Sequence, residues 1–297
     1  MSSSDGSRKA RQISPAGYIW VSRFALILLC VIVVSGAAVR LSGSGLGCSD
    51  WPRCNSEKFI DVSTTHGAIE QINRLFTGLV TAIVIAAVLA ARFRVPYRKD
   101  LVMLSWGLVA GVIGQIVLGG IVVLTDLHPL ANQGHFVLSM VLVANALVLH
   151  HRAKIDRKTD RLTSLSGLQK LIRLTVVMGS VALITGTVVT GSGPHAGDLE
   201  APRLKLDERA ISWLHADAVI ALFGVSLALL VLSEISPETK RRVKIFFAIT
   251  LAQGLVGYAQ YVLGLPEILV IVHVLGSTLV WIASWRIWLS ITTAERT

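Results

Sequence analysis

Charged side chains are scarce in this chain of 297 residues, since only 15% are Asp, Glu, Lys or Arg while 53% are hydrophobic. Soluble domains carry about 25% charged residues, so this composition excludes an ordinary soluble protein with a polar surface. Acidic residues are the rarer kind, 18 against 28 basic residues, and the net charge is +10. Such an excess can indicate nucleic-acid binding. Here the basic residues are confined to alternate loops, which argues against that class and predicts no nucleic-acid partner.

Long apolar runs take the place of the missing charges. A bilayer core about 30 Å thick needs roughly 20 apolar residues per helix. Eight segments fit this description, and they lie at residues 18–39, 68–91, 101–124, 132–149, 171–190, 211–232, 243–263 and 268–289. The first segment lacks a small-residue cleavage site, so we expect a membrane helix there and not a signal peptide. The sequence predicts an all-α membrane protein with eight transmembrane helices.

The basic residues indicate how the chain crosses the membrane. They are Arg8, Lys9 and Arg11 before the first segment, Arg92, Arg94, Arg98 and Lys99 after the second, Arg152, Lys154, Arg157, Lys158 and Arg161 after the fourth, and Lys240, Arg241, Arg242 and Lys244 after the sixth. By the positive-inside rule these loops and both termini are cytoplasmic. We therefore expect a multi-pass protein of the cell membrane. Trp281, Trp285 and Trp288 share one face near a cytoplasmic helix end, where they are expected to form an interfacial belt.

Two stretches of the chain are near copies of each other. Without a gap, the residues of 115–135 that recur in 253–273 are Gln115, Gly119, Leu127 and His135, which align with Gln253, Gly257, Leu265 and His273. Both copies run from an apolar segment through a turn into a second apolar segment that carries the histidine. The segment GAAVRLSGSGLG at 36–47 is similarly echoed by GTVVTGSGPHAGD at 186–198.

The repeat predicts two related halves. We expect two pseudo-symmetric four-helix bundles, at residues 18–150 and 171–290. The remaining parts are a cytoplasmic linker at 151–170, a cytoplasmic tail at 1–17 and a short tail at 291–297.

Cysteine is rare as well, with three residues in the chain. Cys30 lies in the middle of an apolar segment and is expected to be reduced. Cys48 and Cys54 lie in a predicted outer loop, where thiols are more often paired than reduced. A metal pair would lack two further ligands, and two free thiols are the other alternative. We expect a Cys48–Cys54 disulfide.

Polar residues enter the second apolar segment on one face. His66, Glu70 and Asn73 are spaced so that they point the same way over two helical turns. Ionisable groups in a membrane helix usually face the bundle interior and serve a function. The alternative is that Glu70 forms only an ion pair with Arg74, four residues further along.

Four polar residues are expected at one depth. Asn73, His135, His215 and His273 each lie a few residues inside the outer end of a helix, about 6 to 9 Å deep at about 1.5 Å per residue. Two histidines at one level can bind a haem iron from both sides. We therefore expect His215 and His273 to hold a haem in the second half. The first half pairs His135 with Asn73 and carries Glu70 one turn away, which predicts a working site with an open or weakly held iron position near the outer face.

At this point the chain resembles the haem A synthase family of membrane oxidoreductases. The resemblance covers essentially the whole chain, and it rests on GAAVRLSGSGLGCSDWPRC at 36–54, on Glu70-Gln-Ile-Asn73-Arg74, on GSGPHAGD at 191–198 and on the three histidines. It implies oxidation of the methyl group of haem O to the formyl group of haem A for terminal oxidase assembly. It also implies haem b on His215 and His273, a substrate site with His135 and Glu70, and the Cys48–Cys54 disulfide.

Asn73 departs from the family pattern. Many members have histidine at this position, and asparagine is not a strong axial ligand. Either His135 alone holds the iron of haem O, or a group such as His66 supplies the second ligand from about 10 Å along the helix.

The expected partners are haem O, molecular oxygen or water, an electron donor or acceptor, membrane lipid and a haem O synthase. Two other functions bind haem without making haem A. One is a diheme b-type cytochrome that transfers electrons from quinol, and the other is a haem carrier or oxidase assembly factor without turnover.

Overall fold

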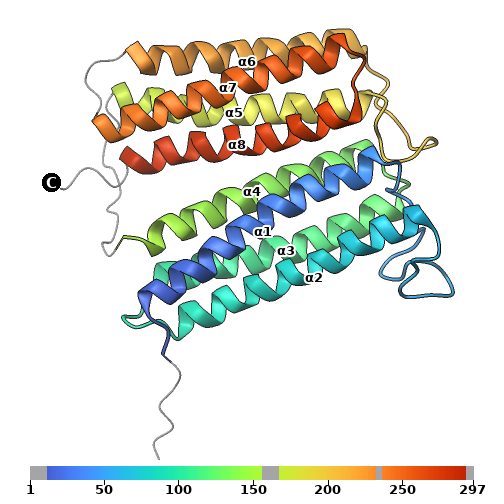
Figure 1. Ribbon diagram of the computed structural model, residues 1–297, viewed down its shortest axis with the longest axis horizontal. Helices are drawn as coiled ribbons and strands as arrows, with labels where there is room; N and C mark the ends of the chain where they lie inside the picture. Colours follow the sequence, from blue (N-terminus) through green and yellow to red (C-terminus); the bar gives the residue numbers. More distant parts are fainter. Residues whose placement is uncertain (1–11, 156–166, 232–235, 292–297) are drawn as a thin grey trace, which may run out of the picture.

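The described part of the chain forms eight long helices, and Figure 1 shows their arrangement. The computed structural model describes residues 12–155, 167–231 and 236–291. The helices are α1 Pro15–Leu41, α2 Thr65–Arg92, α3 Lys99–Leu124, α4 Pro129–Ala153, α5 Gly167–Ser192, α6 Glu208–Val231, α7 Pro237–Val262 and α8 Glu267–Ile291. Each is long and apolar enough to cross a membrane. The predicted all-α, multi-pass membrane protein is confirmed.

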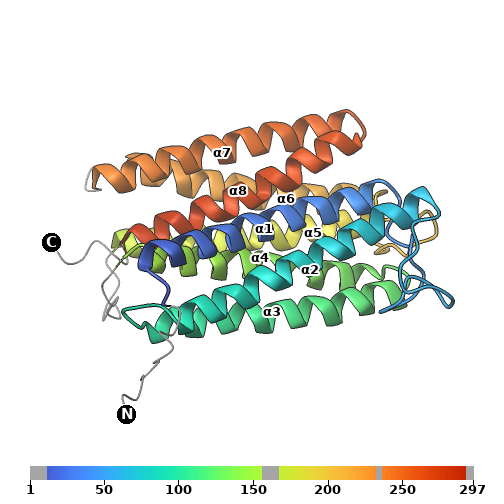
Figure 2. The same cartoon turned by 60° about the horizontal axis from the view of Figure 1, so that its bottom comes forward.

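The helices form two bundles with the same order of neighbours. In the first bundle α1 packs on α2, α2 on α3, α3 on α4, and α4 back on α1. In the second bundle α5, α6, α7 and α8 close the same ring. Figures 1 and 2 show the two groups side by side, and contacts of α1 with α8 and of α4 with α5 and α8 join them. The expected paired four-helix bundles are therefore present.

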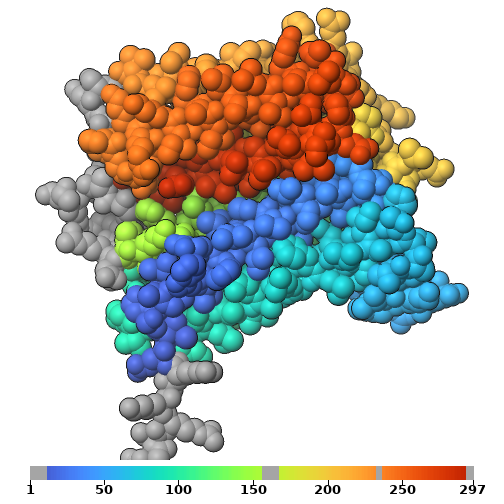
Figure 3. Space-filling view, viewed as in Figure 1, coloured from blue at the N-terminus to red at the C-terminus, as the bar shows by residue number. Residues whose placement is uncertain are grey.

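The two loops that follow α1 and α5 lie at the same end of the molecule (Figure 1). We call this the long-loop end, defined by residues 42–64 and 193–207. Gly45 N donates to Gly197 O at 2.9 Å and so ties the two loops together. Figure 3 shows the surface of one face, with α1 and α2 lying beside α7 and α8.

Local sequence sets the helix starts. Thr64 accepts a hydrogen bond from Gly67 N at 3.0 Å, so α2 begins at Thr65 and contains His66. Ser236 accepts one from Thr239 N at 3.3 Å and precedes Pro237, as is usual at a helix start. The basic residues expected in the loop after the sixth apolar segment therefore lie in the first turns of α7.

The repeat seen in the sequence is visible in the backbone. Leu127 and Leu265 both have positive φ, 62° and 61°, in the turns between α3 and α4 and between α7 and α8. Their backbone N–H groups donate to the carbonyls of Val122 and Gln260 at 2.8 and 2.7 Å. A leucine is strained in this region of φ, and the same strained residue at equivalent positions supports a common design for the two halves.

The predicted tryptophan belt is wrong for Trp281. This side chain is only 7% exposed, and its indole N–H donates to Met140 O of the first bundle at 2.8 Å. It lies between the two bundles because α8 packs on α4.

The two predicted tails and the predicted linker lie partly outside the described residues. Of the 1–17 tail and the 151–170 linker, residues 1–11 and 156–166 are not described. Of the 291–297 tail, only residue 291 is described.

Candidate functional site

One large cavity lies between the bundles towards the long-loop end. Its volume is about 630 Å³, and helices of both bundles line it. This size lies within the range of about 300–1,000 Å³ that is usual for cofactor and ligand pockets. The predicted site residues that border it are Glu70, Asn73, His135, His215 and His273. The fold therefore brings together residues that are up to 203 positions apart in the chain.

Each of the three histidines lies against a glycine of a neighbouring helix. A Cβ atom added to Gly119, Gly186 or Gly257 would lie 3.4, 3.1 or 3.0 Å from Cε1 of His135, His215 or His273, respectively. Ordinary carbon contacts are about 3.5–4.0 Å. These glycines therefore provide the space that each imidazole occupies beside the next helix.

Glutamine side chains bind the backbone of two of these histidines. Gln115 Nε2 donates to His135 O at 3.0 Å, and Gln253 Nε2 donates to His273 O at 2.8 Å. Both glutamines belong to the repeat found in the sequence. The repeat thus preserves the histidine, the facing glycine and the amide that fixes the backbone.

The imidazoles of His215 and His273 face each other. Their ring centres are 6.4 Å apart and their planes differ by 77°. One metal atom between two imidazoles, with bonds of about 2 Å and about 1 Å from each nitrogen to its ring centre, needs a separation of about 6 Å. His215 Nδ1 lies 3.1 Å from Thr185 Oγ1, which can fix the ring orientation. This pair fits an iron porphyrin held from both sides.

His135 and His273 carry buried nitrogen atoms without protein partners. Among the described residues, neither Nδ1 atom has a hydrogen-bond partner. A polar atom buried in this way costs about 1–3 kcal/mol. This cost is offset if the rings serve a ligand in the cavity.

Asn73, the fourth residue predicted beside the three histidines, has a different environment. Asn73 Nδ2 donates to Ser35 Oγ at 2.9 Å, and the repeat pairs Gly36 of α1 with Gly186 of α5. A Cβ atom on Gly36 would meet nothing within 4 Å. The room that His215 fills in the second bundle is therefore open in the first.

Asn73→His is expected to place a second imidazole opposite His135, because Gly36 leaves room for the ring. The variant should gain low-spin haem absorbance, since a second imidazole can saturate the iron. Haem-to-protein ratio and low-spin absorbance, compared among wild type, Asn73→His and His135→Ala, measure this effect. Two low-spin haems of equal affinity in the wild type would contradict the expected asymmetry.

A matched glycine series tests the fit of the histidines. Gly186→Ala and Gly257→Ala are expected to speed haem loss several-fold, because the new methyl group must push the facing ring. Gly36→Ala is the control and should leave the rate unchanged, since its methyl group meets nothing. The measurement is transfer of haem from the purified protein to excess apomyoglobin. Equal rates in all variants would mean that the rings are not seated as the structure has them.

Glu70 is both paired and directed to the cavity. Its Oε1 accepts from Arg74 Nε and Nη2 at 2.9 and 2.5 Å, and its Oε2 accepts from Cys48 N at 2.8 Å. The residue is 6% exposed and borders the cavity. The ion pair considered from the sequence therefore exists, together with a second contact that links Glu70 to the loop after α1.

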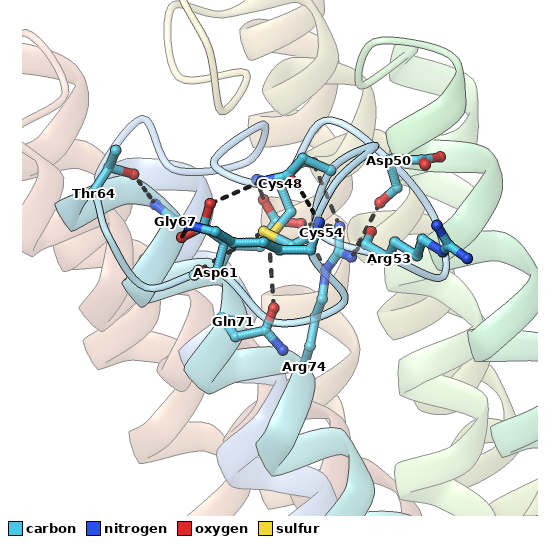
Figure 4. The surroundings of a disulfide bond; sticks show 12 residues. Cys48, Asp50, Arg53, Cys54, Asp61, Thr64, Gly67, Gln71 and Arg74 are labelled. Carbon is cyan, nitrogen blue, oxygen red and sulfur yellow. Dashed lines mark hydrogen bonds and ion pairs between the residues drawn. A yellow bond between two sulfur atoms is a disulfide. The ribbon is translucent and has the colours of Figure 1, made fainter.

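Arg74 also contacts the disulfide loop, and Figure 4 shows its side chain beside that loop. Its Nη1 donates to Asp50 O and Arg53 O, both at 3.1 Å. The expected disulfide joins Cys48 and Cys54, whose residues are 0% and 1% exposed. The loop is thus held against Glu70 in two ways, directly by Cys48 N on Oε2 and through Arg74 on Oε1. The position of the loop therefore sets where the carboxylate lies. Cys30 is free and partly buried, as expected.

His66 is engaged elsewhere. Its Nδ1 lies 2.9 Å from Ser44 Oγ, and the residue does not border the cavity. The geometry gives no support to His66 as the second ligand opposite His135.

Sequence reasoning missed Gly36, Arg40 and Gln133 as cavity residues. An arginine at the end of an apolar segment and a glutamine two residues before the aligned His135 were the available signals. Neither recurs in the repeat, which is why the comparison of halves did not find them.

A comparison with known families identifies the family of this chain. Residues 18–197, more than half of the chain, match the model of the COX15-CtaA family, described as cytochrome oxidase assembly protein. The chain belongs to this family. The resemblance proposed from the sequence is therefore confirmed at the family level.

Relatives of this COX15-CtaA protein carry the name heme A synthase. The protein of Listeria welshimeri is 28% identical over 177 residues, covering 58% of this chain and 57% of its own. That of Bacillus pumilus is 32% identical over 137 residues, covering 43% and 44%, respectively. That of Lysinibacillus sphaericus is 27% identical over 143 residues, covering 48% and 47%. The matches span about half the length of these relatives.

Proposed function

We propose that this protein is a haem A synthase, a membrane oxidoreductase that converts a methyl group of haem O into the formyl group of haem A for terminal oxidase assembly. One observation carries the proposal. Three half-buried histidines, each seated against a glycine, border a single cavity together with Glu70 in a chain of the COX15-CtaA family.

The two bundles would have different functions, electron transfer in the second and substrate binding in the first. His215 and His273 would hold a haem b in the second bundle, where two strong ligands suit electron transfer. His135 would hold haem O in the first bundle. Asn73 leaves the opposite side open, as oxygen chemistry or an exchangeable porphyrin requires. The unequal ligand sets favour an enzyme over a diheme cytochrome of equal sites.

Glu70 would act at the substrate site as a proton acceptor or donor. Its Oε2 receives the Cys48 N–H and its Oε1 receives Arg74, so the carboxylate is held rigidly at the cavity wall. Removing hydrogens from a methyl group and adding oxygen requires proton transfer, an oxygen source and an electron donor or acceptor. Molecular oxygen or water would supply the oxygen atom, and a haem O synthase would supply the substrate.

The long-loop end would face outward, with both termini in the cytoplasm. The basic residues at the other end of the helices support this orientation, since cytoplasmic loops are enriched in Lys and Arg. Arg92, Arg98, Arg152 and Lys240 all lie there. The active site would then lie towards the outer face of the cell membrane.

Pigment analysis tests the function directly. The chain is produced with a haem O synthase in cells that lack their own haem A synthase, and extracted haems are separated by chromatography and identified by mass. Haem A is expected only when this chain is present. A carrier or a diheme cytochrome would bind haem and leave haem O unchanged, so that result would overturn the enzyme proposal.

A further inference from the structure

Arg40 places a positive charge at the long-loop end of the cavity. Arg40 lies in the last turn of α1 and borders the cavity. Its Cγ would lie 3.4 Å from a Cβ atom on Gly197, so the stem packs against the loop after α5. Within residues 12–155, 167–231 and 236–291, no carboxylate forms an ion pair with its guanidinium group. A charge at this depth needs a partner to offset its desolvation.

A second arginine lies in the loop that the stem of Arg40 contacts at Gly197. Arg203 is held in that loop by its own bonds to Ala201 O and Pro194 O at 2.9 and 2.7 Å. Positive charges at one end of a cavity repel each other, and an anion beside them removes that repulsion.

Gln133 adds an unused donor to the same cavity. It lies on α4 and borders the cavity, and its Nε2 atom is buried without an acceptor among the described residues. A Cβ atom on Gly191 of α5 would lie 2.7 Å from this Nε2, so the amide fits against bare backbone. An unpaired buried donor costs about 1–3 kcal/mol, which points to an acceptor supplied by a ligand.

We propose that Arg40 and Gln133 bind carboxylate groups at the edge of the porphyrin in this cavity, an inference that rests on the proposed haem binding. The remaining walls are mainly apolar, and they suit a flat hydrophobic body with acidic groups at one edge. Guanidinium groups match carboxylates with paired hydrogen bonds. The internal repeat has Thr190 and Ile271 in place of Arg40 and Gln133, so this carboxylate subsite occurs once.

A pair of porphyrins that differ only in their carboxylates tests this subsite. The purified full-length protein in detergent is titrated with hemin and with hemin dimethyl ester, followed by Soret absorbance, and the haem content as purified is recorded. Arg40→Gln and Gln133→Leu are compared with wild type. Arg209→Gln is the control, because Arg209 is an exposed arginine over Trp213, 5.6 Å from its ring centre.

Wild type and Arg209→Gln are expected to bind hemin at least tenfold more tightly than its ester. Arg40→Gln should lose about tenfold in hemin affinity and little in ester affinity, in keeping with a hydrogen bond to a charged group. Gln133→Leu should show a smaller loss of the same kind. Equal loss for both porphyrins, or no loss of affinity or haem content, would overturn the subsite. Haem A formation is measured separately, so failure of this inference is distinct from failure of the proposed enzyme.

Discussion

His215→Ala and His273→Ala are each expected to yield purified protein without the low-spin haem spectrum and with most of the resident haem lost. The two imidazoles face each other at 6.4 Å between ring centres, the spacing that a shared iron atom needs. Removing either ring leaves one strong ligand for the iron. Haem-to-protein ratio and the reduced absorbance spectrum measure the loss.

Two further variants separate ligation from folding. His128→Ala is the control, because His128 is an exposed residue at the start of α4 and should retain the wild-type spectrum. His273→Gly is expected to recover low-spin absorbance when free imidazole is added, since the small molecule can take the place of the ring. An unchanged low-spin spectrum in both alanine variants would remove His215 and His273 from the ligand set.

Glu70→Ala is expected to lower haem A formation by about a hundredfold, within the range for loss of a group that transfers protons. The haem b ligands lie in the other bundle, so the low-spin spectrum should remain. The truncation also leaves Arg74 and Cys48 N without their acceptor, and breaking a buried ion pair costs about 3–5 kcal/mol. Thermal stability is therefore recorded alongside haem A yield.

Glu70→Gln separates the loss of proton transfer from the loss of the contact between Glu70 and the disulfide loop. The amide can still accept the Cys48 N–H, but it cannot take up a proton or pair with the Arg74 charge. We expect the glutamine variant to keep its disulfide loop and resident haem and to remain deficient in haem A. Glu57→Gln, an exposed acid in the same loop, is the matched control. Normal haem A yield in Glu70→Ala would reduce Glu70 to a structural partner of Arg74.

The sequence predicted the parts of the site that repeat. His135 and His273 recur with Gln115 and Gln253 and with Gly119 and Gly257, and the structure places each group against the next as described. The roles assigned to these residues remain predictions. The disulfide was also accessible from sequence, because two cysteines in one predicted outer loop are close in any fold.

Parts of the cavity that occur once were not accessible. Arg40 and Gln133 have no counterpart in the second half. Gly36 does have one in Gly186, and only the structure shows that the space beside Gly36 is open. Whether a polar side chain has a partner depends on groups from other helices, which local sequence does not specify. The ion pair of Glu70 with Arg74 follows from their spacing, but the contact of Glu70 with Cys48 N depends on how the loop folds back.

The sequence by itself determined the number of membrane helices and the two related halves, whereas the depth of Asn73, His135, His215 and His273 stays a prediction. The number of helices follows from the length of apolar runs and the predicted depth from helical rise, and both are local properties. Only the tertiary structure decided which helices meet. It placed Trp281 between the bundles, where the indole N–H donates to Met140 O, although a shared helix face near a cytoplasmic end had predicted an interfacial belt. The physical reason is that periodicity fixes which side chains share a face of a helix, whereas packing of α8 on α4 decides what that face touches.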